Sequence, residues 1–265
     1  MTRRHAFALF VPAILVSCTT PSMAPPAAVA DLAPAGRLRA AINFGNPILA
    51  TKDATTGEPR GVSVDLSREL ARRLGVPLEL VTYDAAGKVV DGLKTGAWDV
   101  AFLAIDPARA VGISYTAPYV VIEGAYLVPE ASSIRSNADV DRSGTRVVVG
   151  NGSAFDLFLS RVLKQATLVR AATSQAVTDT FVAGKLEVAA GVRQQLEADA
   201  KRIPGLRLLD GRFMVINQAL GTPRGRAAGA QFLRTFVEAM KASGFVAEAL
   251  ARHQIEGASI APAAQ

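Results

Sequence analysis

Arg109 is the residue whose type and position best fit a chemical role. It follows Asp106, Pro107 and Ala108 in a loop directly after an apolar run, and open α/β sheets bind ligands beyond the carboxyl ends of their strands. A planar guanidinium can donate two parallel hydrogen bonds to a carboxylate, which a lysine cannot do. The alternative is a solvated surface arginine. The position favours a binding site for an anionic group.

Gly152 and Ser153 are a second candidate pair, because they precede a segment with helical spacing. The free N–H groups and the macrodipole at a helix N-terminus attract anions. Glycine lets a ligand approach the backbone, and the serine hydroxyl can donate a hydrogen bond. The simpler interpretation is that Ser153 only caps the helix, and the two roles are compatible.

The composition excludes several other kinds of site. Among 265 residues, half of them hydrophobic, the chain has a single cysteine, Cys18, and two histidines, His5 and His253. These residues supply no disulfide framework, no cysteine-based zinc site and no Ser-His-Asp triad, so we expect neither metal nor cofactor. The net charge is +6, but no run of five basic residues occurs, so nucleic acid is not an expected partner.

The N-terminus predicts export. Residues 1–17 combine a basic start with an apolar stretch that is too short to span a bilayer, as in a signal peptide. The following Cys18 ends the sequence Leu-Val-Ser-Cys, which resembles a bacterial lipobox, so we expect Cys18 to carry a lipid anchor in the membrane. Cleavage after Ala30 is the alternative. Residues 18–35, rich in proline and alanine, are predicted to form a flexible tether.

From residue 36 onward, strand and helix patterns alternate twice, which predicts an α/β protein with two lobes. Two long apolar segments, 119–128 and 213–221, can cross between the lobes. The expected strands are 38–44, 78–83, 99–105, 146–150 and 186–192. The predicted boundaries are lobe 1 at 36–122, lobe 2 at 123–214, a return to lobe 1 with C-terminal helices at 215–258, and a tail at 259–265.

Short motifs in this order resemble a known family. They are Gly36-x-Leu38, Gly57-x-x-x-Gly61-Val62-x-Val64-Asp65-Leu66, Leu93-x-x-Gly96-x-x-Asp99, Pro107-x-Arg109, Ala117-Pro118-Tyr119, Val149-Gly150-x-Gly152-Ser153 and Gly184-x-x-Glu187. Over about residues 36–257 the chain resembles the bacterial extracellular solute-binding proteins of family 3, the polar amino-acid type of ABC-transporter receptor. The resemblance implies a two-lobed periplasmic binding protein fold, with two hinge strands and lobes that close on a small ligand.

The resemblance also implies a ligand site. Arg109 would bind the ligand carboxylate, Gly152 and Ser153 would contact it from lobe 2, and Ala104 would offer only a backbone carbonyl. Asn46, with Phe44 beside it, would pack on the ligand, although Asn46 can equally be a turn residue before Pro47. Asp106 stands where the family usually has Ser or Thr, and it could pair with Arg109 or accept a ligand ammonium.

One departure puts an ordinary α-amino acid in doubt. Amino-acid binders of this family carry an acidic residue just after the second-lobe strand, and here Val192 and Arg193 occupy that region. If Arg193 faced the cleft, two cations would favour an anionic or dicarboxylic ligand; if it began the next helix, facing water, it would indicate nothing. Glu123, on the presumed crossing strand, is another acidic candidate near the hinge.

The leading prediction is a monomeric, lipid-anchored solute-binding protein that delivers a small carboxylate-bearing solute, an amino acid or an organic acid, to an inner-membrane ABC permease. The alternative is a periplasmic enzyme on the same scaffold, such as a cyclohexadienyl dehydratase-like lyase with Asp106 or Glu123 as general acid. A ligand-sensing partner of a membrane receptor is a third possibility, which the sequence does not distinguish from transport.

Overall fold

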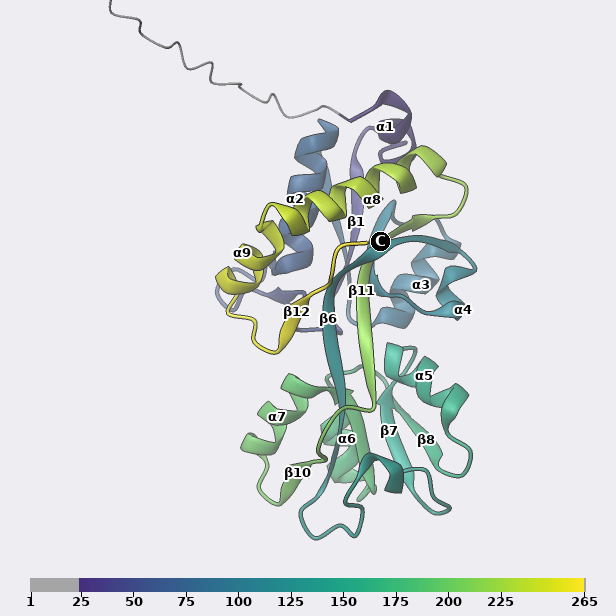
Figure 1. Cartoon of the computed structure of the whole chain (residues 1–265), viewed down its shortest axis with the longest axis vertical. Helices are drawn as coiled ribbons and strands as arrows, with labels where there is room; N and C mark the ends of the chain where they lie inside the picture. Colours follow the sequence, from purple (N-terminus) through teal and green to yellow (C-terminus); the bar gives the residue numbers. More distant parts are fainter. Residues whose placement is uncertain (1–23, 265) are drawn as a thin grey trace, which may run out of the picture.

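The computed structural model describes residues 24–264. It consists of two α/β lobes, one above the other along the long axis of the molecule, with two long strands running between them (Figure 1). The predicted signal segment, 1–17, and the predicted lipid attachment residue, Cys18, lie outside the described residues. Among those described, no helix combines the length and the apolar character needed to cross a membrane.

Lobe 1 is built on a parallel core of three strands. β1 (Leu38–Asn43) lies between β4 (Leu78–Tyr83) and β5 (Val100–Ala104), and the antiparallel β11 (Met214–Pro223) follows β5. The other elements of this lobe are β2 (Thr51–Lys52), β3 (Pro59–Arg60), α2 (Val62–Leu74), α3 (Ala86–Lys94), α4 (Pro107–Ala110), α8 (Ala227–Ala242) and α9 (Phe245–Arg252).

Lobe 2 repeats this plan. β7 (Arg146–Gly150) lies between β8 (Thr167–Ala171) and β9 (Val188–Val192), and all three strands are parallel. The remaining elements are a short 3₁₀ helix (Asn137–Asp139), α5 (Ala154–Val162), α6 (Val177–Ala183), α7 (Arg193–Arg202) and β10 (Leu206–Leu208). The strand β8 is not among the strands expected from the sequence.

The two lobes share their hinge strands. β6 (Ile113–Pro129) runs from lobe 1 into lobe 2, and it pairs with β11 in lobe 1 and with β9 in lobe 2. The two long apolar segments of the sequence, 119–128 and 213–221, therefore lie on β6 and β11. A third strand, β12 (Ala258–Ile260), pairs with β6 at Val120 to Ile122.

Two predicted boundaries need correction. The segment 18–35 is not a tether throughout, because α1 (Pro26–Leu32) buries Ala28 and Leu32, and its Asp31 accepts a hydrogen bond from the Gly229 N–H of α8 at 2.9 Å. The tail 259–265 is not loose at its start, because Ser259 and Ile260 belong to β12. Both segments are held by tertiary contacts that local composition does not encode.

The helix α2 illustrates how the sequence sets the elements. Leu66, Leu70 and Leu74 recur at helical spacing and are all buried, so one face of the helix packs into the core of lobe 1. The helix ends at Gly75, whose φ of 68° lies in the left-handed region, which glycine adopts without steric cost.

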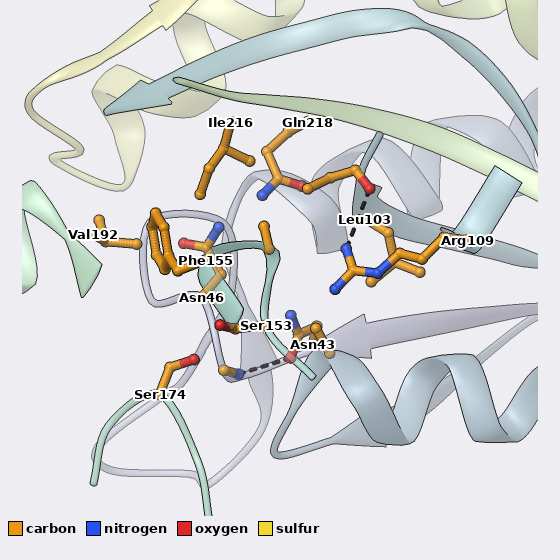
Figure 2. Close-up of a pocket in the computed structure, with 14 residues that line it drawn as sticks. Asn43, Asn46, Leu103, Arg109, Ser153, Phe155, Ser174, Val192, Ile216 and Gln218 are labelled. Atoms are coloured by element: carbon orange, nitrogen blue, oxygen red, sulfur yellow. Dashed lines mark hydrogen bonds between the residues drawn. The ribbon is translucent and has the colours of Figure 1, made fainter. Parts of the chain in front are cut away.

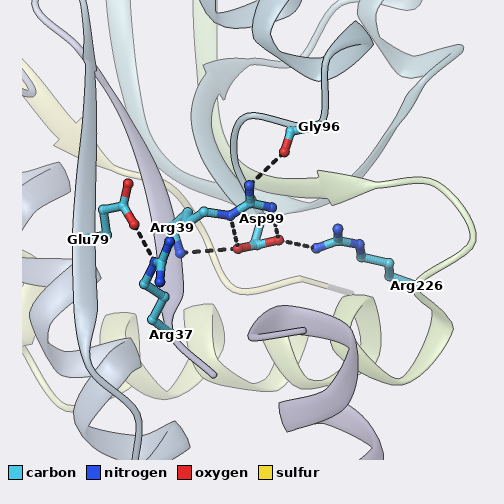
Figure 3. A network of polar contacts seen from close by, with 6 residues as sticks. All are labelled: Arg37, Arg39, Glu79, Gly96, Asp99 and Arg226. Atoms are coloured by element: carbon cyan, nitrogen blue, oxygen red, sulfur yellow. Dashed lines mark hydrogen bonds and ion pairs between the residues drawn. The ribbon is translucent and has the colours of Figure 1, made fainter. Parts of the chain in front are cut away.

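A buried ion-pair network stabilises lobe 1 at the amino-terminal ends of β1 and β5 (Figure 3). Asp99 is fully buried and accepts hydrogen bonds from Arg39 at 2.9 Å and from Arg226 at 2.8 Å. Burial raises the pKa of Asp99, but the hydrogen bonds from the two guanidinium groups outweigh it, so the pKa of this carboxyl is lowered. The motif Leu93-x-x-Gly96-x-x-Asp99 thus ends on a residue that ties β1 and β5 to the start of α8.

Candidate ligand-binding site

A cavity of about 30 Å³ lies between the lobes (Figure 2). It is bounded by the carboxyl ends of β1, β5 and β9, the start of α5 and the strand β11, which agrees with the rule that α/β sheets bind ligands at strand ends. Its lining consists of Asn43, Gly45, Asn46, Ala86, Leu103, Ala104, Arg109, Ser153, Ala154, Phe155, Ser174, Val192, Ile216 and Gln218. A second cavity of about 20 Å³ shares Gly45, Phe155, Ser174 and Val192 with it.

Arg109 connects the two lobes across this cavity. Its side chain is buried, with 4% of the residue exposed. One terminal nitrogen donates to the Ala104 carbonyl at 3.2 Å in lobe 1, and the other donates to the Gly152 carbonyl at 2.9 Å in lobe 2. The Nε–H has no partner among the described residues. Burial lowers the pKa of Arg109, although a guanidinium stays charged in proteins.

The start of α5 forms the lobe 2 side of the cavity. The Ser153 hydroxyl caps the helix by accepting from the Asp156 N–H at 3.2 Å, and Ser153 also lines the cavity. The cap interpretation is confirmed, and the hydroxyl hydrogen remains available to a ligand. The N–H groups of Ala154 and Phe155 belong to the first helical turn, so they have no intrahelical acceptors.

Asn46 and Ala104 also lie where the sequence predicted. Asn46 lines the cavity, and its Oδ1 accepts from the Ile48 N–H at 3.2 Å. It is therefore a turn residue whose side-chain nitrogen remains available. Ala104 offers only its carbonyl, and Arg109 uses that carbonyl. Whether these residues bind a ligand stays a prediction.

Two other candidates lie beside the cavity instead of lining it. The Asp106 carboxylate does not pair with Arg109; it caps α4 at the Ala108 N–H and forms an ion pair with Arg161 of lobe 2 at 2.7 Å. The Phe44 ring faces the Lys52 ammonium at 5.4 Å. Each of these two side chains therefore already has a protein partner, Arg161 for Asp106 and Lys52 for Phe44.

Of the two alternatives for Arg193, the structure has the one in which this residue begins the next helix and does not line the cavity. Arg193 begins α7 and pairs with Glu123 at 3.1 Å, away from the cavity. Glu123 also pairs with Arg212 at 2.7 Å, and the hydrogen bond from Arg212, followed by that from Arg193, lowers its pKa. Val192 ends β9 and lines the cavity, whereas its neighbour Arg193 begins α7 and does not line it.

Sequence reasoning missed several lining residues. The polar ones are Asn43, Ser174 and Gln218, and the apolar ones include Phe155 and Ile216. Gln218 is 5% exposed and its Oε1 has no partner among the described residues. A glutamine inside the apolar segment 213–221 is the signal that could have indicated it, since a buried amide needs a hydrogen-bond partner.

The lobes touch each other around the cavity. Besides the bond from Arg109 to Gly152 and the pair of Asp106 with Arg161, the Gln175 side chain of lobe 2 donates to the Phe44 carbonyl of lobe 1. Within residues 24–264 no group of three or more His, Cys, Asp or Glu residues is arranged to hold a metal ion. The cavity between the lobes can enclose a small solute. It offers that solute one guanidinium group, several hydroxyl and amide groups, and the N–H groups of a helix N-terminus.

Two lobes, two hinge strands and an interlobe cavity define a two-lobed binding protein. Residues 38–254 match the bacterial extracellular solute-binding proteins, family 3. The chain belongs to this family, so the resemblance stated from the motifs is confirmed. The comparison with curated proteins finds no match.

Solved structures share the fold at low identity. The solute receptor for L-cysteine of Neisseria gonorrhoeae has a TM-score of 0.74 at 22% identity, covering 86% of this chain and 94% of that chain. The P235GK mutant of ArgBP from T. maritima has a TM-score of 0.73 at 21% identity, covering 86% and 100%. The ancestral amino acid-binding protein AncCDT-1, a precursor of cyclohexadienyl dehydratase, has a TM-score of 0.72 at 20% identity, covering 86% and 99%.

Proposed function

We propose that this chain is an exported, lipid-anchored receptor that captures a small carboxylate-bearing solute between its lobes and delivers it to an inner-membrane ABC permease. The family gives the general role, an extracellular solute-binding protein. The cavity supports the finer statement about the ligand, and the lobe closure supports delivery, because a permease must distinguish loaded from unloaded receptor.

The position of Arg109 carries the proposal. A guanidinium that is almost fully buried and that, within residues 24–264, donates only to two neutral carbonyls is placed to receive an anion. The N-terminus of α5 faces the same cavity and adds backbone N–H groups. A carboxylate between them would contact both lobes, so binding would favour the closed form.

Lipid attachment at Cys18 is part of the same proposal. The alternative cleavage after Ala30 would remove most of α1, whose Ala28 is buried. Cleavage before Cys18 leaves α1 intact. The intact mass of the mature protein, compared with that of a Cys18→Ser variant, separates the two: lipid attachment adds acyl mass to a chain that starts at residue 18, and the variant lacks it.

The lyase alternative lacks support from the geometry. Its candidate acids, Asp106 and Glu123, each pair with arginine outside the cavity lining, and the pKa of Glu123 is lowered, opposite to what a general acid requires. The likeness to the precursor of cyclohexadienyl dehydratase concerns the fold alone. A prephenate-loss assay tests this alternative directly, and measurable turnover would favour it.

The proposal is tested by identifying what the protein carries. Mass spectrometry of the small molecule that copurifies with the native protein should find a carboxylate-bearing solute. Calorimetry on protein stripped of that molecule, against the amino acids and common organic acids, should show saturable binding. Absence of binding by every such solute would reject the proposal.

A further inference from the structure

Within residues 24–264, Arg109 is the one charged side chain that lines the cavity in Figure 2 or the second cavity that shares Phe155 with it. We infer that the site takes a monoanion without an ammonium group, of the 2-hydroxy or unsubstituted monocarboxylate class. The inference rests on the proposed function and adds the chemical class of the ligand. It separates this site from one built for zwitterions, which needs a carboxylate to balance the ligand ammonium.

The nearby carboxylates are already neutralised by other arginines. Asp106 pairs with Arg161 at 2.7 Å. Asp156, behind the start of α5, pairs with Arg170 at 2.9 Å and accepts from the Gly152 N–H. Glu123 lies beyond the lining with its own arginine partners. None of these carboxylates lines the two cavities beside Arg109 and Phe155, although Asp106 lines a wider cavity next to them together with its partner Arg161. A ligand in the first two cavities therefore meets one positive charge and no negative one.

The wall contributed by lobe 2 and the hinge is apolar where a second charge would lie. Val192 from β9, Phe155 from α5 and Ile216 from β11 form one group of side chains in Figure 2, on the side away from Arg109. An ammonium placed there would lose its hydration without gaining a charged partner, and an uncompensated buried charge is strongly unfavourable. A methyl or hydrogen substituent meets no such penalty.

Gln218 indicates what the cavity can bind besides a carboxylate. Its Oε1 is buried without a partner among the described residues, and Figure 2 shows its amide beside Ile216, between that side chain and Arg109. A ligand hydroxyl could donate to this oxygen, and the reversed amide could donate to a ligand carbonyl.

Pairs of ligands that differ in one group test the inference. The probes are glycolate against glycine and lactate against alanine, with both enantiomers of the latter pair, titrated by calorimetry into protein stripped of bound solute. Each pair exchanges a hydroxyl for an ammonium at nearly constant size. We expect the hydroxy acid of at least one pair to bind about 100-fold more tightly than its amino acid, as the cost of an unpaired buried charge requires.

A variant of Val192 tests the physical reason. Val192→Asp places a carboxylate at the end of β9 and should reverse the order within each pair, so that the amino acid binds more tightly. Val192→Asn has nearly the same size without the charge and should keep the wild-type order. Urea unfolding checks that both variants fold. If Val192→Asp does not fold, the comparison of the paired ligands on the wild-type protein still tests the inference.

The outcomes separate this inference from the proposed function. Amino acids that bind the wild type as tightly as their hydroxy acids would overturn the inference, while the receptor role would stand. The same holds if none of these probes binds and a larger or cationic solute does. If no amino acid or organic acid of any kind binds, both fail.

Discussion

Arg109 bonds across the lobes to the Gly152 carbonyl and is the proposed partner of the ligand anion, so its replacement should affect binding more than folding. Arg109→Met removes the guanidinium and should weaken binding of the solute identified by mass spectrometry by about 3–5 kcal/mol, the range for breaking a buried charge pair. Arg109→Lys keeps the charge but not the planar geometry, and we expect a loss of about 1–2 kcal/mol. Calorimetry measures both.

Arg207 provides a control of similar chemistry. Its guanidinium also donates to backbone carbonyls, those of Glu130, Ser132 and Ile134, but it lies outside the cavity lining. Arg207→Met should leave affinity within experimental error, even if it lowers stability. Equal losses of affinity in Arg109→Met and Arg207→Met would contradict a direct role of Arg109.

Asp99 is important for stability and not for binding, because its network lies in lobe 1 away from the cavity. Asp99→Asn leaves the Arg39 and Arg226 guanidinium groups without their buried partner, and we expect the free energy of unfolding to fall by about 3 kcal/mol at neutral pH. Urea unfolding measures it. Asp91, whose ion pair with Lys94 is largely exposed, is the control: Asp91→Asn should cost less than about 0.5 kcal/mol.

At the scale of elements, the sequence predicts what periodicity controls. The strands 78–83 and 146–150 and the leucine stripe of α2 follow directly from side-chain patterns, and the structure has them. The helix α1 and the strand β12 were not predicted, because each is short and is stabilised by distant partners in α8 and β6. Tertiary contacts override weak local signals.

The same distinction holds for the site. Arg109, Ser153 and Asn46 lie at ends of elements that the sequence locates, so their placement at the cavity could be predicted. The orientation of Arg193 depends on where β9 ends and α7 begins, which the sequence left open, and Ser174 lies in a loop without a sequence pattern. Ion-pair partners such as Asp106 and Arg161 lie far apart in the sequence and in different lobes, so they can be identified only once the two lobes are placed against each other.

The last two turns of α2 contain a pH-dependent stabilising group. Hydrogen bonds from Arg72, which has the largest effect, and from Arg73 lower the pKa of Glu69 from 4.5 to about 2. The folded state therefore favours the ionised carboxylate. This stabilisation is complete above about pH 4.5 and is lost as the pH falls toward 2. Glu69→Gln should therefore cost about 1 kcal/mol at pH 7, a value reduced because both arginine partners are partly solvated, and progressively less below pH 4.5.

Urea unfolding of wild type and Glu69→Gln at pH 7, 4 and 3 measures this dependence, and an NMR titration of the Glu69 carboxyl carbon measures the pKa itself. A difference in unfolding free energy that stayed constant over this pH range would show that the glutamine acts through packing and not through charge.

At the scale of the whole molecule, closure of the two lobes on a solute requires that their backbones can approach each other closely. Gly152 at the start of α5 faces Gly87 of α3, and a Cβ on Gly152 would lie 2.9 Å from the Gly87 Cα. The Gly87 Cα is a backbone atom, and the position of the added Cβ is fixed by the backbone of residue 152, so the contact can be relieved only by shifting the backbone of one lobe. Gly152→Ala should therefore weaken solute binding at least about tenfold by opposing closure, in addition to a strain of about 1–2 kcal/mol from its positive φ.

Gly205 separates these two effects. It also lies in lobe 2 with a positive φ, 82° against 65° for Gly152, but a Cβ there meets nothing within 4 Å. Gly205→Ala should show the backbone strain in urea unfolding and leave the affinity unchanged. In small-angle scattering at saturating solute, Gly152→Ala should keep a larger radius of gyration than wild type, whereas Gly205→Ala should not. If both variants lost affinity equally, closure at Gly152 would not be what limits binding, and the strain alone would explain the loss.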